Sequence, residues 1–136
     1  MTQNSIPLQT ATETLSPEVQ VHAAAHAFAQ ALAESAEFQA FEQAAERLRQ
    51  DETAQQAILA YQNKQQSLQM MLRLNAVSPQ DQAEFERLQK GFLNQPSVAA
   101  YLQAQEELNA LCQAAAGLLS ERIGLSYTAA CGPGCC

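Results

Sequence analysis

Residues 52–75 read ETAQQAILAYQNKQQSLQMMLRLN, a stretch that contains neither glycine nor proline. Side chains that suit an inner helix face recur in it about every 3.5 residues, at Ala54, Ile58, Tyr61, Gln65, Leu68, Leu72 and Asn75. This spacing is typical of one face of an α-helix. Asp51 stands directly before the stretch, where a carboxylate caps the first amide groups of a helix. The sequence therefore predicts a long helix that begins after Asp51 and ends near Asn75.

Two shorter helices are predicted on the N-terminal side of this stretch. Ser16, Pro17 and Glu18 form a helix start, because they combine a capping hydroxyl, a proline at the first helical position and an early acid. Apolar positions then follow at helical spacing, first at Val21, Ala25, Phe28 and Leu32, and after Ser35 at Phe38, Phe41, Ala45 and Leu48. The register changes at Ser35, so we expect a kink or a short break there.

Two further helices are predicted on the C-terminal side. Ser78, Pro79 and Asp81 repeat the capping pattern, and we expect Gly91 to help end this short helix. Its inner face would carry Phe85, Leu88 and Phe92. Asn94 and Pro96 open the last helix, whose apolar positions continue to Ile123 and Gly124. We expect this helix and the one centred near Gln65 to be close to 40 Å long each, lengths that suit an antiparallel helical hairpin.

These elements predict an all-α fold, an antiparallel helical bundle of four to five helices with two long helices. We expect residues 1–16 to be a flexible tail, since they are polar and hold few apolar side chains. Residues 17–126 would form the helical domain, and residues 127–136 a cysteine-rich tail. Alanines on the inner faces would let helices approach closely, the large apolar and aromatic residues would form the core, and an apolar strip would remain for self-association.

Composition and charge exclude several classes of function. All five glycines of the 136 residues lie at or after Gly91, which disfavours β-rich folds and glycine-rich nucleotide-binding loops. Acidic residues outnumber basic ones 14 to 7, for a net charge of −7, and the basic residues are scattered. Direct binding to nucleic acid is therefore disfavoured. No membrane-spanning segment and no leader peptide is recognisable in the sequence, so we expect a cytoplasmic protein.

Few residues in the helical region suggest chemistry. His22 and His26 share a helix face, but no further metal ligand accompanies them, and they are interpreted as surface or half-buried side chains. Glu106 with Glu107, and Glu84 with Glu86, point in different directions on a helix and are interpreted as solvated carboxylates. No nucleophile motif is present, so the protein is predicted not to be an enzyme and to have no catalytic residue.

The C-terminal tail has a different character, because it holds three of the four cysteines, Cys131, Cys135 and Cys136, around the turn-forming residues 132–134. Thiolates in a glycine-rich loop suit a soft metal or an iron–sulfur cluster. A fourth ligand would be Cys112, a non-cysteine residue or a cysteine of a partner chain, although Cys112 also fits a small buried residue in a helix. A redox-active or incidental tail and a lipid acceptor remain as alternatives.

The chain resembles the YlbF/YmcA family of bacterial regulators over roughly residues 18–126. The resemblance rests on residues 31–38, which read ALAESAEF, on residues 44–51 leading into 57–61, on Gln65 and Gln66, on residues 88–92, and on residues 94–102, which read NQPSVAAYL, followed by Glu106, Glu107 and Leu108. The cysteine-bearing tail favours the YlbF branch.

The resemblance implies a non-enzymatic role in a complex. Its implied partners are YmcA-like and YaaT-like proteins, and the implied processes are competence, sporulation, biofilm formation and transcript maturation with RNase Y. It also implies an iron–sulfur cluster of the 4Fe-4S type shared between subunits, with Cys131, Cys135 and Cys136 as ligands, whereas zinc or no metal is the alternative. A metal or thiol-redox carrier and a cluster-free structural interaction module stay open as other functions.

Overall fold

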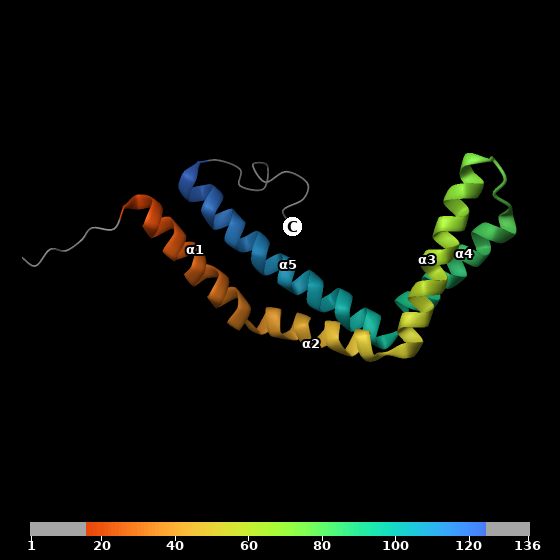
Figure 1. Cartoon of the computed structure of the whole chain (residues 1–136), viewed down its shortest axis with the longest axis horizontal. Helices are drawn as coiled ribbons and strands as arrows, with labels where there is room; N and C mark the ends of the chain where they lie inside the picture. The colour runs from red at the N-terminus through yellow and green to blue at the C-terminus, as the bar shows by residue number, and fades with distance from the viewer. Residues whose placement is uncertain (1–15, 125–136) are drawn as a thin grey trace, which may run out of the picture. The chain divides into compact units, whose positions relative to one another are not determined.

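The computed structural model describes residues 16–124, which form five α-helices and no strand (Figure 1). The helices are α1 (Pro17–Glu34), α2 (Ala36–Gln50), α3 (Glu52–Arg73), α4 (Pro79–Leu93) and α5 (Pro96–Ile123). They belong to two compact units that divide between Ala33 and Glu34. In the first unit, α1 buries none of its side chains. The second unit contains α2 to α5, and the predicted all-α class is confirmed.

The predicted helix starts at Ser35, Asp51 and Ser78 are confirmed by capping hydrogen bonds, whereas α5 begins at Pro96 with Gln95 as an N-cap that makes no side-chain hydrogen bond. The Ser35 hydroxyl accepts a hydrogen bond from the Phe38 amide at 3.2 Å, so the break between α1 and α2 lies at this serine. Asp51 accepts one from the Ala54 amide at 3.1 Å and starts α3. Ser78 and Asp81 form a reciprocal capping box at the start of α4. Each of these side chains satisfies an amide that the first helical turn leaves without a partner.

The predicted helix ends are confirmed only in part. Gly124 ends α5 with a φ of 68°, a left-handed conformation that glycine adopts without steric cost. Gly91, however, does not end α4, because the helix continues through it to Leu93 and Asn94 is the C-cap. A helix interior tolerates one glycine at a cost of about 1 kcal/mol, so a glycine alone was an insufficient stop signal. With 22 residues, α3 is about 33 Å long, shorter than expected, whereas the 28 residues of α5 span about 42 Å.

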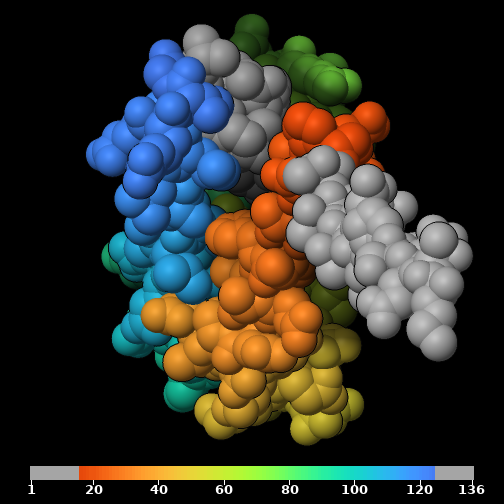
Figure 2. All heavy atoms as spheres, turned by 90° about the vertical axis from the view of Figure 1, so that its left-hand side faces the viewer, coloured from red at the N-terminus to blue at the C-terminus, as the bar shows by residue number. Residues whose placement is uncertain are grey.

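The helices of the second unit pack as two antiparallel pairs, α2 with α5 and α3 with α4. The expectation that the two long helices form a hairpin with each other is therefore wrong. The connection between α3 and α4 is short, residues 74–78, and these two neighbouring helices pack against each other. The partner of α5 is α2, which packs along its first half. The space-filling view shows the side chains of α2 against those of α5 (Figure 2).

The core of residues 16–124 consists of four small side chains, Ala44, Ala54, Val98 and Ala104, which are at most 7% exposed. The expected role of alanine in close helix approach is confirmed by this set. The expectation that the large apolar and aromatic residues form the core is wrong, because none of them is fully buried. Two helices that pack as a pair, without a third element, leave the larger side chains at their seam open to one side.

Candidate assembly surface

The contact between α2 and α5 is built from small residues and one polar bond. Phe41 and Tyr101 pack with ring centroids 5.3 Å apart, next to the buried Ala44 and Ala104. At the end of this pair, the Ser97 hydroxyl donates a hydrogen bond of 2.6 Å to Asp51 Oδ2. That bond, together with the Ala54 amide, lowers the pKa of Asp51 below its ordinary value. One carboxylate thus caps α3 and fixes the first turn of α5.

The contact between α3 and α4 is aromatic. The Tyr61 ring lies 5.1 Å from that of Phe85 and 4.6 Å from that of Phe92, measured between ring centroids. All three rings are only half-buried, and α4 has no buried residue at all. Offset and tilted arrangements of this kind are favourable for aromatic pairs. The two helices alone therefore hold the rings in place without removing them from water.

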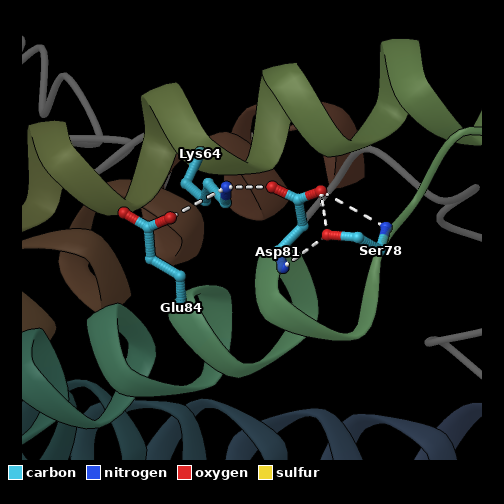
Figure 3. A network of polar contacts seen from close by, with 4 residues as sticks. All are labelled: Lys64, Ser78, Asp81 and Glu84. Atoms are coloured by element: carbon cyan, nitrogen blue, oxygen red, sulfur yellow. Dashed lines mark hydrogen bonds and ion pairs between the residues drawn. The ribbon is translucent and has the colours of Figure 1, made fainter.

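A polar network closes the α3–α4 pair at its border (Figure 3). Lys64 Nζ on α3 lies 2.8 Å from Asp81 Oδ1 and 3.0 Å from Glu84 Oε2 on α4. The Ser78 hydroxyl donates a 2.6 Å hydrogen bond to Asp81 Oδ2. Because Lys64 and Ser78 both stabilise the carboxylate form, the pKa of Asp81 falls to about 2, and the two acids raise the pKa of Lys64. The Lys64 side chain is only 13% exposed, so the network fixes how α4 sits along α3.

Large apolar side chains remain exposed across the described helices, in line with the expected apolar strip. In the second unit they are Leu59, Met70, Leu72, Leu74, Leu93, Leu102, Leu118, Leu119 and Ile123, and in α1 they are Val19, Val21 and Phe28. Single exposed apolar residues are ordinary, but many of them around a core of four small side chains make these helix faces candidate contact surfaces.

Hollows on the described surface are shallow and carry no catalytic grouping. One of about 380 Å³ follows α5, and another of about 220 Å³ lies between α2 and α5. Alanine and glutamine are prominent in their linings, with carboxylates at Glu106 and Glu107. Within residues 16–124 no helix is both long and apolar enough to cross a membrane.

The structure describes three of the metal-ligand candidates, on two different helices. His22 and His26 are exposed on α1, and Cys112 is half-buried on α5. No group of three His, Cys, Asp or Glu side chains that could hold a metal occurs within residues 16–124. Cys131, Cys135 and Cys136, the ligands predicted from the sequence, lie outside the described residues.

Sequence reasoning missed the polar bonds between helices. Glu84 was expected to be simply solvated, but it is paired with Lys64 while half of its side chain stays exposed. Spacing rules within one helix do not show which residues of a second helix come opposite. A signal was nevertheless present, because Lys64 is the only charged residue between Glu52 and Arg73 on α3.

Comparisons with known proteins identify the family. The family model described as "Control of competence regulator ComK, YlbF/YmcA" matches residues 21–124. The chain belongs to this family. A UPF0342 protein of Desulfitobacterium hafniense (strain Y51) is similar, with 31% identity over 100 residues that cover 73% of this chain and 76% of the relative. No solved structure matches the chain.

Membership of the YlbF/YmcA family makes the protein a member of a family of regulators, and the resemblance inferred from the sequence is confirmed. The matched region spans almost all of α1 and the whole of α2 to α5, and it ends before the cysteine tail. The family match therefore covers the helices that carry the exposed apolar side chains, and not the cysteine tail.

Proposed function

We propose that this YlbF/YmcA-family chain is a non-enzymatic scaffold that assembles with itself or with related helical proteins. One observation carries the proposal: residues 16–124 bury only four small side chains, while twelve large apolar residues are 39% to 72% exposed. Packing these faces against a partner would remove apolar surface from water at about 25 cal/mol per Å². A regulator built this way acts by bringing proteins together.

The proposal extends to an iron–sulfur cluster at the C-terminal tail, held by Cys131, Cys135 and Cys136. The chemistry of this donor set supports it, since three thiols within six residues suit a soft metal or cluster. The fourth ligand would be Cys112 or a cysteine of another subunit. When subunits share the cluster, its binding favours the assembled state by linkage. We extend the proposal to YmcA-like and YaaT-like proteins as partners and to RNase Y-dependent RNA processing as the regulated process, whereas the description of the matched family names the control of competence.

Anaerobic purification followed by iron and sulfide analysis and a visible spectrum tests the cluster. We expect bound iron and sulfide that are lost when Cys131, Cys135 and Cys136 are all changed to serine. Cys112→Ser is the matched control: loss of iron in this variant would assign the fourth ligand to α5, and retention would assign it elsewhere. A colourless, iron-free wild-type protein would sink the cluster while leaving a cluster-free interaction module.

Native mass measurement separates the scaffold from a monomeric metal or redox carrier. The scaffold forms dimers or larger assemblies, and a carrier keeps its metal as a monomer. A protein that stays monomeric, alone and with its helical partners, would rule out the scaffold.

A further inference from the structure

The two histidines of this chain lie about one turn apart on α1, and its 136 residues contain no others. His22 and His26 stand at positions i and i+4, whose Cβ atoms are about 5–6 Å apart on a helix. Three alanines separate them in the sequence, so no large side chain between them crowds the two rings. The backbone of α1 therefore presents both imidazoles on the same face of the helix.

Both imidazoles are accessible to a ligand. His22 and His26 are exposed, and neither ring takes part in a hydrogen bond or an ion pair with another residue of the described range 16–124. A ring nitrogen in this state binds a ligand without first breaking a contact inside the protein. Packing and hydrogen bonding within the described helices therefore leave the nitrogens of both rings available.

The chemistry of two imidazoles at this spacing favours a transition-metal ion. Imidazole nitrogen suits Zn²⁺, Cu²⁺ and Ni²⁺, whereas Mg²⁺ and Ca²⁺ prefer oxygen ligands. Zn²⁺ holds its nitrogen ligands at about 2.0–2.1 Å, and histidines four residues apart on a helix are able to share one zinc ion. Glu18, which is exposed one turn before His22, and the net charge of −7 add an attraction for cations.

We propose that His22 and His26 together bind one Zn²⁺ ion, with water in its remaining coordination positions. Within residues 16–124 no third His, Cys, Asp or Glu joins them in a metal-binding group. A site with two protein ligands binds its ion more weakly and exchanges it more readily than a four-ligand structural zinc site. The site is separate from the proposed cluster of the cysteine tail, because its ligands are nitrogen atoms of α1.

The bound ion would stabilise the helix that holds it. Because α1 buries none of its side chains, burial contributes little to its stability, and helices in proteins depend mostly on packing for theirs. A bridge between His22 and His26 needs helical backbone from one turn to the next. Zinc binding therefore favours the helical state of α1 by linkage.

Proton NMR of the imidazoles measures the binding directly, because the chain has only two histidines. The full-length variant in which Cys131, Cys135 and Cys136 are all changed to serine is titrated with Zn²⁺, since the tail thiols would compete for the ion. We expect both imidazole signals to shift together with one Kd, and Mg²⁺ at the same concentrations to shift neither. His26→Ala should raise the Kd by roughly tenfold or more, because the second ligand then no longer binds within the same molecule.

Two double variants in the same background form a matched pair that keeps two imidazoles on exposed positions of α1. His26→Ala with Ala24→His spaces the rings two residues apart, so they point to different sides of the helix and should bind as weakly as one imidazole. His22→Ala with Gln30→His restores the spacing of four residues, and we expect its Kd to lie within about threefold of that of the parent. Circular dichroism checks that every variant keeps its helix content.

Amide hydrogen exchange tests the effect on the helix. At a Zn²⁺ concentration ten times the Kd, exchange in α1 should slow by roughly tenfold, whereas exchange in α3 should not change.

Equal Kd values for the pairs spaced two and four residues apart would overturn the inference, because each imidazole would then bind zinc alone. A titration that shifts only one imidazole signal, or neither, would also overturn it, as would an equal response to Mg²⁺. Unchanged exchange in α1 at saturating zinc would overturn the stabilisation of the helix. None of these results would bear on the scaffold or on the cysteine cluster, because the test involves neither the apolar helix faces nor the tail thiols.

Discussion

The α2–α5 and α3–α4 pairs are both antiparallel, but they pack in opposite ways. Between α2 and α5, Ala44 and Ala104 are almost completely buried, so the two backbones approach closely there, although the Phe41 and Tyr101 rings stay half-buried. Between α3 and α4, the three aromatic rings stay half-buried and no α4 residue is buried. Small residues let backbones approach and close a seam by themselves, whereas large rings hold the helices apart and need another layer. The α2–α5 pair therefore contributes buried side chains to the core, whereas the α3–α4 pair leaves its aromatic rings partly exposed.

Enlarging a buried alanine should disrupt the packing of α2 against α5. Ala104 is 7% exposed, and Ala104→Leu forces α5 away from α2, so we expect the free energy of unfolding to fall by about 3 kcal/mol. Ala99→Leu, at an exposed position of the same helix, should change it by less than about 0.5 kcal/mol. Urea denaturation of both variants measures the difference. Equal losses would mean that α2 and α5 are not closely packed in solution.

Removing the Tyr61 ring should weaken the packing of α3 against α4 by an amount that depends on protein concentration. Tyr61 touches Phe85 and Phe92 but is only half-buried, so Tyr61→Ala should cost about 2 kcal/mol in dilute protein, less than full burial would imply. Under the proposed self-assembly, the loss should grow as the protein is concentrated, because a copy that covers the half-buried wild-type ring stabilises the folded chain by linkage.

Tyr101→Ala is the matched control for this concentration dependence, because Tyr101 contacts Phe41 in the α2–α5 pair. We expect its cost to be independent of protein concentration in denaturation curves recorded at several dilutions. The same concentration dependence in both variants would remove the distinction between the two pairs.

Local features of this fold were predictable from the sequence, and contacts between helices were not. Ser35, Asp51 and Ser78 mark helix starts because each bonds an amide within three residues of itself. Gly91 misled because a single glycine ends a helix only when the glycine itself adopts a left-handed conformation, as Gly124 does.

Helix pairing depended on geometry that periodicity does not contain. The apolar stripes of α3 and α5 predicted inner faces only in part, because Leu72 and Leu118 are exposed, and they did not show which helix each stripe faces. The Ser97–Asp51 bond joins residues 46 apart. Burial was misjudged for the same reason, since a stripe becomes core only where another element covers it. The cysteine ligands and the apolar strip for self-association both remain predictions from the sequence.

The bond between Ser97 and Asp51 can be removed while the helix cap stays. Ser97→Ala deletes the 2.6 Å hydrogen bond to Asp51 Oδ2, but the Ala54 amide still donates to Oδ1. We expect the melting temperature to fall by a few degrees. The pKa of Asp51 should rise toward its ordinary value, because Ser97 is the largest cause of its depression. A carboxyl titration by NMR that shows no change in Asp51 would contradict the bond.

The smallest predicted effect is a loss of folding stability at low pH, and it arises in the α3–α4 pair and not in the α2–α5 pair. The pKa of Asp81 is about 2 in the folded chain against an ordinary 3.8, so its stabilising contribution is complete above about pH 5 and is lost as pH falls toward about 2. At near-neutral pH, Asp81→Asn should therefore be less stable than wild type. That difference should shrink progressively below about pH 4.

Lys64→Met serves as the control for this acid dependence, because it removes the largest cause of the low Asp81 pKa. In the Lys64→Met background, Asp81→Asn should show a weaker dependence on pH, since only the bonds from Ser78 still favour the carboxylate. Urea denaturation of the four proteins between about pH 5 and pH 2 measures both differences. An equal pH dependence in the two backgrounds would mean that Lys64 does not stabilise Asp81, and that only the bonds from Ser78 favour its carboxylate.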